Sequence, residues 1–262
     1  MALLAIGVFV LLSTFKSVIG GLEGFIVGGD YVESITEYPH VASLAIELSG
    51  NDYILCGSSI LNQVILITAA HCLDKSEDVI ASVGSVIVEQ GEPYRVIKFK
   101  QHEKWKNSLH DIALCRLEKP LSLGETVKRV LLMRQPPITQ TAVLTGWGAY
   151  EEIDYLESVQ LKHSIQKVWT YKTCKKVVKT APNGTICGGP GDELKDQGNF
   201  ASRGDSGSGL IVNSNIIIGL VSFKNLKYSR SIVVYTDVAY YYDWIVRESK
   251  RLLCQKKIVK RS

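Results

Sequence analysis

The sequence predicts an all-β fold of two lobes, followed by a C-terminal helix. Short runs rich in β-forming residues recur between turn residues, which is typical of barrels and sandwiches rather than of parallel α/β units. A proline-containing stretch at 133–141 divides these runs into two series and marks the join between the lobes. After residue 237 the hydrophobic pattern changes to the spacing of a helix.

Each lobe is expected to contain five recognisable strands. The first lobe has runs at 41–48, 53–61, 64–68, 94–100 and 111–117, and the second at 142–145, 159–165, 209–212, 216–223 and 232–236. In the last segment, 238–253, the apolar residues with helical spacing are Val238, Tyr241, Tyr242, Ile245 and Leu252. We therefore expect a terminal helix that docks on the two lobes.

The composition is that of a globular protein. The chain has 262 residues, of which 46% are hydrophobic and 21% charged, so it is long enough to bury one or two substantial cores. These values exclude collagenous, coiled-coil and disordered chains. The formal net charge of +4 is small and scattered, so we expect no nucleic-acid partner.

The N-terminus predicts export. The apolar run at 2–12 is shorter than the roughly 20 residues of a membrane span but suits a secretory signal. We expect a signal peptide at 1–20, a propeptide at 21–25 and a secreted domain at 26–262 that does not enter a membrane. The sequon at Asn183 and an even count of six cysteines fit glycosylation and disulfides in an oxidising compartment. No cysteine pair has CxxC spacing, so metal binding is the less favoured role for the cysteines. We expect no metal and no cofactor.

Three short stretches hold the residue types of nucleophilic catalysis. A serine hydroxyl is a poor nucleophile unless a base removes its proton, and a histidine does this best when a carboxylate fixes its tautomer. Taken singly, these stretches also fit a core histidine, a turn acid and an ordinary loop. The stretches are Thr68-Ala69-Ala70-His71-Cys72, His110-Asp111-Ile112-Ala113-Leu114 and Gly204-Asp205-Ser206-Gly207-Ser208-Gly209.

With these motifs in the order His, Asp, Ser, the sequence resembles the trypsin and chymotrypsin family of serine proteases. The resemblance extends through Ile26-Val27-Gly28-Gly29, Gly146-Trp147-Gly148, and Tyr235-Thr236 with Trp244. It implies a chymotrypsin-like fold of two antiparallel six-stranded β-barrels and a C-terminal helix, with the active site between the barrels. It also implies that His71 is the general base, that Asp111 orients it and that Ser206 is the nucleophile.

The resemblance further implies an oxyanion hole and an activation switch. Backbone N–H groups of Gly204 and Ser206 are expected to bind the oxyanion. Asp205 is expected to accept the new ammonium group of Ile26 after cleavage, so the unprocessed chain is a zymogen. Phe25 precedes that bond, where the family usually has Arg or Lys. Activation by a chymotrypsin-like or self-cleaving step is therefore favoured over a trypsin-like one.

The cysteines follow the family's pattern in part. The resemblance implies a disulfide between Cys56 and Cys72 beside the histidine, and another between Cys174 and Cys187 near the substrate pocket. Cys115 and Cys254 have no common family counterpart. They could bridge the first lobe to the terminal helix, or Cys115 could be a buried free thiol.

The sequence departs from the family in the pocket for the substrate side chain. Phe200, six residues before Ser206, stands where trypsin-like enzymes have Asp, so trypsin-like specificity is not expected. The resemblance also places Ser222 in this pocket, and counting from Ser222 and Tyr235 aligns Lys224 and Val233 with two glycines that usually leave the pocket open. The resemblance therefore implies a narrowed or filled pocket.

Three classes of function remain open at this stage. The first is a monomeric secreted serine endopeptidase of non-tryptic specificity, with protein or peptide substrates and protein inhibitors as its partners. The second is a weak or inactive protease homologue with an occluded pocket, which acts as a decoy, regulator or binding module. The third is a structural or adhesive secreted protein, which no feature of the sequence favours. The retained triad places the first class ahead.

Overall fold

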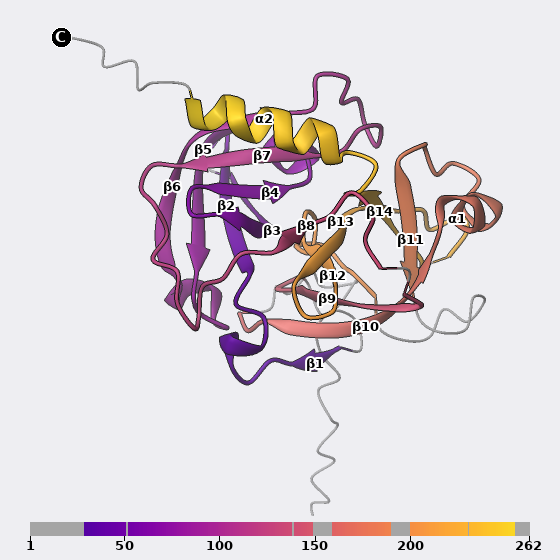
Figure 1. Cartoon of the computed structure of the whole chain (residues 1–262), viewed down its shortest axis with the longest axis horizontal. Coiled ribbons are helices and arrows are strands. Elements are labelled where there is room, and N and C mark those ends of the chain that lie inside the picture. The colour runs from indigo at the N-terminus through magenta and orange to yellow at the C-terminus, as the bar shows by residue number, and fades with distance from the viewer. Residues whose placement is uncertain are drawn as a thin grey trace, which may run out of the picture.

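The computed structural model describes residues 29–50, 52–137, 139–148, 159–189, 200–229 and 231–254 (Figure 1). The expected signal peptide at 1–20, the propeptide at 21–25 and Ile26 lie outside these residues. The described chain forms two β-barrels with a helix at the C-terminal end, so the expected fold class is confirmed.

Six strands close the first barrel in the order β2-β3-β4-β7-β6-β5. Leu44, Ile46 and Ile60 are fully buried in it. Between β3 and β4, the side chain of Asn62 accepts the N–H groups of Val64 and Ile65, at 3.0 Å each, which fixes a tight turn. The six strands are β2 (Val41–Leu48), β3 (Asp52–Asn62), β4 (Ile65–Thr68), β5 (Ser76–Val83), β6 (Glu92–Gln101) and β7 (Ala113–Leu117).

The second barrel also contains six strands, in the order β10-β11-β14-β13-β12-β9, and pairing of β9 with β10 closes it. Two short strands extend this sheet, since β1 (Asp30–Tyr31) pairs with β10 and β8 (Leu131–Leu132) runs parallel to β13. The six strands are β9 (Thr141–Gly146), β10 (Lys162–Trp169), β11 (Thr185–Gly189), β12 (Gly209–Val212), β13 (Ile216–Lys224) and β14 (Val233–Asp237).

The C-terminal helix α2 (Tyr242–Cys254) lies across the outside of the first barrel, beside β7 and β6 (Figure 1). Its Ile245 and Leu252 are buried with Leu114 of β7. The helix starts four residues later than the pattern predicts, because the Asp237 carboxylate accepts the N–H groups of Ala239 and Tyr240 and holds a preceding turn. No helix among the described residues is long and apolar enough to cross a membrane.

The remaining helical elements are short. Helix α1 (Tyr171–Val177) packs beside β11 at the far end of the second barrel (Figure 1). Three turns of 3₁₀-helix complete the described chain, at η1 (Ile35–Glu37), η2 (His71–Leu73) and η3 (Val88–Gln90). Since η2 directly follows β4 and carries the histidine of the first motif, it is the element that matters for the site.

Candidate active site

The two barrels contribute different parts of one site. From the first barrel come His71, at the start of η2, and Asp111, two residues before β7. From the second barrel comes Ser206, in the turn before β12. A backbone hydrogen bond of 2.8 Å, from the N–H of Gly57 in β3 to the carbonyl of Ser206, joins the serine turn to the first barrel. The three motifs, far apart in sequence, are thereby brought to one place.

The carboxylate of Asp111 is almost fully buried and receives three hydrogen bonds. The Oδ1 atom accepts the backbone N–H of His71 at 2.9 Å, and Oδ2 accepts the imidazole Nδ1 of His71 at 2.8 Å. Ser222 donates its hydroxyl to the same Oδ2 atom at 2.5 Å. Because an ionised carboxylate only accepts, these contacts place the imidazole proton on Nδ1 and leave a lone pair on Nε2. His71 therefore has the tautomer of a general base.

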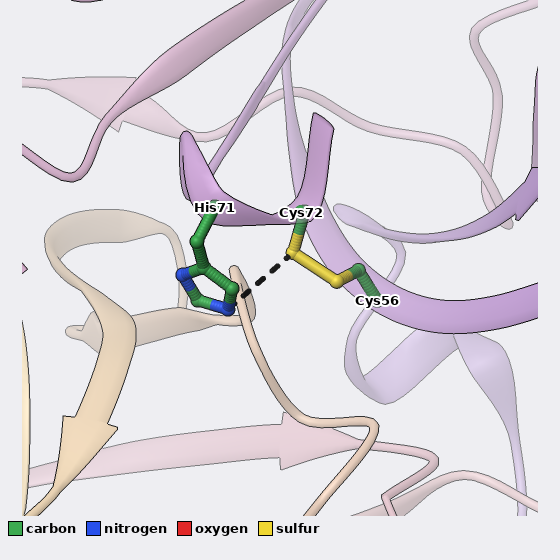
Figure 2. A group of neighbouring side chains, drawn as sticks. All are labelled: Cys56, His71 and Cys72. Atoms are coloured by element: carbon green, nitrogen blue, oxygen red, sulfur yellow. Dashed lines mark hydrogen bonds between the residues drawn. A yellow bond between two sulfur atoms is a disulfide. The ribbon is translucent and has the colours of Figure 1, made fainter. Parts of the chain in front are cut away.

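The hydrogen bonds of His71 do not extend to Ser206 in the described part of the chain. Its Nε2 lies 3.9 Å from Cys72 Sγ instead, as the dashed line in Figure 2 shows. Catalytic hydrogen bonds are often long before substrate binds and shorten in the complex. The base is thus oriented by Asp111, without a hydrogen bond to Ser206 among the described residues.

The disulfide beside His71 also decides whether this site suits a metal. Among the described residues, one group of His, Cys or acidic side chains lies close enough together to share an ion. It consists of Cys56, His71 and Cys72 (Figure 2). The two sulfurs are bonded to each other, so neither is the thiolate that a zinc ion requires. The group therefore does not fit a metal centre while the disulfide is intact.

The turn before Ser206 presents two backbone donors. Gly204 has a φ of +93°, in the left-handed region that glycine tolerates best. In this turn the N–H groups of Asp205, Gly207 and Ser208 donate to other backbone carbonyls. Those of Gly204 and Ser206 have no acceptor among the described residues. Two free donors beside a serine hydroxyl are what an oxyanion requires.

Asp205 is fully buried behind this turn. Its carboxylate accepts the N–H of Gly148 at 2.9 Å and that of Ser202 at 2.8 Å. Burial is the largest influence on this group and raises its pKa to about 6, although both hydrogen bonds oppose the shift. Ile26, the expected partner of this carboxylate, lies outside the described residues. A buried acid with a raised pKa is a group that a cation would stabilise.

The space around Asp205 explains two glycines that sequence reasoning used only as a family signature. A Cβ atom at Gly146 would lie 2.0 Å from an oxygen of Asp205, and one at Gly148 would lie 2.4 Å from its Cγ atom. Distances this short require the buried carboxylate or the strand to move. The Gly146-Trp147-Gly148 segment therefore forms the cradle for Asp205.

We expect Gly148→Ala to lower the free energy of unfolding by about 1–3 kcal/mol, because the added methyl group overlaps a buried carboxylate. Urea denaturation of the variant measures this change. Gly124→Ala is the matched control, since a Cβ atom there meets nothing within 4 Å. Equal stability of the two variants would contradict the close packing around Asp205.

The residues expected in the specificity pocket lie together. Phe200 is buried in one cluster with Val233 and Tyr235, and Lys224 lies opposite Val233 in the pairing of β13 with β14. The Lys224 ammonium is 4.5 Å from the centre of the Phe200 ring, which is a cation–π contact. Ser222, in contrast, turns its hydroxyl toward Asp111.

The cysteines divide into two disulfides and two free thiols. Cys56–Cys72 and Cys174–Cys187 are bonded, with sequence separations of 16 and 13 residues, and loops of this length are worth about 3 kcal/mol each. A bridge between Cys115 and Cys254, which the sequence left open, is wrong because both thiols are free. Cys115 points into the first barrel, where burial raises its pKa to about 12, while Cys254 is exposed at the end of α2.

Asn183 is exposed in the loop between α1 and β11, where a glycan would meet solvent. The Thr185 hydroxyl of the sequon donates to the carbonyl of Pro182 at 2.7 Å. Glycosylation at this site stays a prediction.

Sequence reasoning missed two hydroxyls that support Asp111. Ser222 donates to its carboxylate, and Thr236 donates to its backbone carbonyl at 2.7 Å. They are 111 and 125 residues away from Asp111 along the chain, on β13 and β14. The resemblance pointed to both residues, but to Ser222 as part of the pocket and to Thr236 as a signature, so only the folded topology reveals these contacts.

The chain is similar in sequence to known proteins over most of its length. Hypodermin-B of Hypoderma lineatum is 34% identical over 241 residues, which cover 87% of this chain and 89% of that protein. Trypsin epsilon of Drosophila erecta is 32% identical, with 88% of this chain and 90% of that protein covered. Both alignments span almost the whole of each protein.

Solved structures share the fold. A structure described as HL collagenase aligns with a TM-score of 0.72 at 23% identity, covering 86% of this chain and 98% of the other. The scabies mite inactivated protease paralogue S-D1 aligns with a TM-score of 0.73 at 23% identity, covering 87% and 97%. The fold thus occurs in proteins whose names describe both a protease and an inactivated paralogue.

The family model described as Trypsin matches residues 26–245, which include all three motifs and both barrels. Together with the relatives above 30% identity, this match shows that the chain belongs to the trypsin family of serine proteases.

Proposed function

We propose that this chain is a secreted serine endopeptidase, made as a zymogen, that hydrolyses peptide bonds with non-tryptic specificity. The observation that carries the proposal is the buried Asp111 carboxylate, which holds the His71 imidazole in the tautomer that accepts a proton at Nε2. The expected partners are protein or peptide substrates and protein inhibitors. The disulfides and the sequon at Asn183 support an oxidising, extracellular setting.

In the proposed mechanism, Ser206 attacks the scissile carbonyl while His71 takes the hydroxyl proton at Nε2. Asp111 stays ionised and stabilises the imidazolium ion that forms. The N–H groups of Gly204 and Ser206 bind the negative oxygen of the tetrahedral intermediate, and one such donor is worth roughly 10²–10³ in rate. His71 then protonates the leaving amine, and water releases the acyl group by the same steps in reverse order.

Labelling with a fluorophosphonate, read beside cleavage of a peptide library, tests the proposal. A competent triad gives covalent labelling at Ser206 together with turnover. No labelling of the processed chain would contradict both the mechanism and the assignment of Ser206 as the nucleophile.

A second candidate is a weak or inactive homologue that acts as a decoy, regulator or binding module. The contact between Lys224 and Phe200 favours it, since these side chains lie where the family's pocket is expected to receive the substrate. Labelling of Ser206 without turnover of any peptide would support this candidate, because the nucleophile would then be active while substrates are excluded.

Opening the pocket should change the specificity. We expect Phe200→Ser combined with Lys224→Gly and Val233→Gly to raise kcat/KM for cleavage after Phe or Tyr by about 10- to 100-fold. The reason is that overlap with these three side chains, rather than their charge, excludes large substrate side chains from the pocket. Hydrolysis of matched peptide substrates measures the change.

Val212→Gly is the control for the stability that this triple variant loses, because Val212 is buried in the same cluster as Phe200 but is not a pocket residue. It should not gain this activity. Efficient cleavage after Arg, Lys or Phe by the unchanged enzyme would show that Phe200 does not form the floor of the pocket.

A further inference from the structure

Two histidine rings stack on each other beside the segment that carries Asp111. His102 directly follows β6, and His110 directly precedes Asp111. The ring centres of this histidine pair lie 4.6 Å apart, with 7° between the ring planes. Tyr241, directly before α2, and Trp244, within α2, pack against the half-buried rings. The histidine pair thus links the first barrel to the C-terminal helix at the residue next to Asp111.

The backbone of His110 has a conformation that its side-chain contacts must hold. Its φ is +53°, in the left-handed region that few residues other than glycine adopt. Its carbonyl accepts the N–H of Ile112 at 2.9 Å, so the chain makes a tight turn around Asp111. The ring is held by the stack on His102 and by Tyr241, whose hydroxyl lies 3.0 Å from Nδ1. These two contacts therefore fix the turn from which the Asp111 side chain extends.

Both the backbone and the ring of His102 are fixed. The backbone N–H donates to the carbonyl of Ile112 at 3.0 Å, one residue beyond Asp111. The ring atom Nδ1 accepts the N–H of Lys104 at 3.2 Å, which places the proton of the neutral ring on Nε2. Protonation of His102 would turn this acceptor into a donor and break the hydrogen bond. The local geometry therefore favours a neutral His102.

The groups that face His102 also oppose its protonation. Burial is the largest influence on its pKa and lowers it, while the charge of Glu103 acts in the opposite direction. The charges that act with burial are those of His110, Arg247 and Lys104. Glu103 accepts Nε1–H of Trp244 at 2.8 Å, and this hydrogen bond is the main cause that lowers its pKa to about 2. Glu103 is therefore already ionised in the range where imidazoles take up protons.

Tyr241 and Asp111 are the titratable groups on the other side, beside His110. Burial is the largest cause that raises the pKa of Tyr241, so its hydroxyl keeps its proton. A hydroxyl can donate or accept, so it can bond to Nδ1 of His110 whether or not that ring is charged. The Asp111 carboxylate is already engaged by His71 and Ser222. The stack, rather than these contacts, is therefore what changes when acid is added.

We propose that His110 is a positioning residue for Asp111 and that the histidine pair makes this positioning sensitive to acid. The inference rests on the proposed function, since it concerns the same triad. One proton leaves a neutral ring beside a charged one and causes no repulsion. A second proton places like charges on rings whose centres are 4.6 Å apart, so the rings separate and the turn at His110 loses a contact that holds it. Asp111 then no longer orients His71.

NMR titration of the processed chain with Ser206→Ala tests this positioning without requiring turnover, and EDTA in the buffer keeps metal ions from the imidazoles. The Nδ1 proton that His71 shares with Asp111 gives a downfield ¹H resonance. As the pH falls from 8 to 5, this resonance should broaden and disappear when His110 is present, because the shared proton exchanges with water once Asp111 moves. It should persist in His110→Asn, since asparagine adopts left-handed backbone readily and takes up no proton.

The rate of fluorophosphonate labelling of the processed chain, with Ser206 intact, measures the effect on the reaction. Protonation of His71 alone makes the logarithm of the rate fall with a slope of about 1 per pH unit, and the histidine pair should make this fall steeper. We expect His110→Asn to label at least threefold faster than the unchanged chain at pH 5, and within twofold of it at pH 8. His110→Ala should label about 10-fold more slowly at pH 8, because alanine makes neither contact and disfavours this backbone.

Two further variants complete the test. His102→Phe keeps an aromatic ring for the stack but takes up no proton, so it should show the shallower acid limb even if His110→Asn fails to fold. His163→Gln is the matched control, since it removes an imidazole on β10, outside the histidine pair, and should keep the steep acid limb of the unchanged chain. Melting temperatures show which variants are folded.

The two readouts separate this inference from the proposed function. If the chain labels but the His71 resonance and the acid limb are the same with and without the histidine pair, the inference is wrong and the protease function stands. The inference is also wrong if His163→Gln makes the acid limb as shallow as His110→Asn does. If no chain labels at any pH while His110→Asn still preserves the His71 resonance in acid, the positioning stands and the protease function fails.

Discussion

Ser206→Ala is expected to abolish peptide hydrolysis, with kcat lowered by about 10⁶. Ser206 supplies the attacking oxygen, and alanine keeps the backbone N–H that is expected to bind the oxyanion. The Ser206 carbonyl retains its hydrogen bond from Gly57, so the fold should be preserved. Turnover of the best substrate from the peptide library measures the loss, and the melting temperature shows that the variant is folded.

His71→Ala should be about as severe, and the double variant scarcely worse, because members of a triad act as a unit. Ser49→Ala, at an exposed serine between β2 and β3, is the matched control and should leave kcat unchanged. If the Ser206 variant kept the turnover of the unchanged enzyme, Ser206 would have no part in the mechanism.

The pattern of apolar residues along the sequence predicted those strands whose apolar side chains fill the barrels. All ten expected runs coincide with strands to within four residues, because their alternating or continuous apolar residues are the ones that fill the barrels. Two barrel strands were missed. β5 begins with Ser-Glu-Asp, and β11 ends in two glycines, so neither has the composition of a strand. Pairing with β2 and β6, and with β10 and β14, holds them in place instead.

The residue types of the site could be predicted, but their contacts could not. His71, Asp111 and Ser206 stand in short motifs, whereas the support of Asp111 by Ser222 depends on β13 of the second barrel lying beside the segment that carries Asp111. Cys115 is likewise a free thiol because of the direction in which its side chain points. A β-strand sends alternate side chains to opposite faces, and Cys115 points inward while α2 packs outside. Sequence spacing alone does not reveal which of the two faces a cysteine occupies.

Cleavage before Ile26 is expected to switch the enzyme on, so the processed chain should react with a fluorophosphonate and a chain retaining Phe25 should not. With no cation paired to it among the described residues, the buried Asp205 has its pKa raised from 3.8 to about 6. A raised carboxyl pKa stabilises the fold below pH 4, and this contribution is lost as the pH rises through 6. Two pKa units correspond to about 3 kcal/mol, which is the contribution that Asp205 loses over that range. The buried His40, whose pKa burial lowers to about 4, acts in the opposite direction, so the comparison with Asp205→Asn isolates the Asp205 contribution.

The ammonium group of Ile26 should reverse this loss in the processed chain. Pairing raises the pKa of the ammonium above its unfolded value of about 8, so its stabilisation is complete below that value and fades as the pH rises through the higher folded pKa. The difference in unfolding free energy between processed and unprocessed chains should therefore be small at pH 4, greatest near pH 7 and smaller again above the ammonium pKa. Urea denaturation across this range measures it.

Asp205→Asn separates the ion pair from the shape of its site. The amide has nearly the size of the carboxylate and keeps an oxygen to accept one of the N–H groups of Gly148 and Ser202, but it carries no charge for the ammonium to neutralise. The processed variant should label at least 10-fold more slowly. Its stability should no longer depend on whether the chain is processed, at any pH between 4 and 8. Labelling at the full rate would show that the turn carrying Gly204 and Ser206 is ordered without the ion pair, and that cleavage before Ile26 is not the switch.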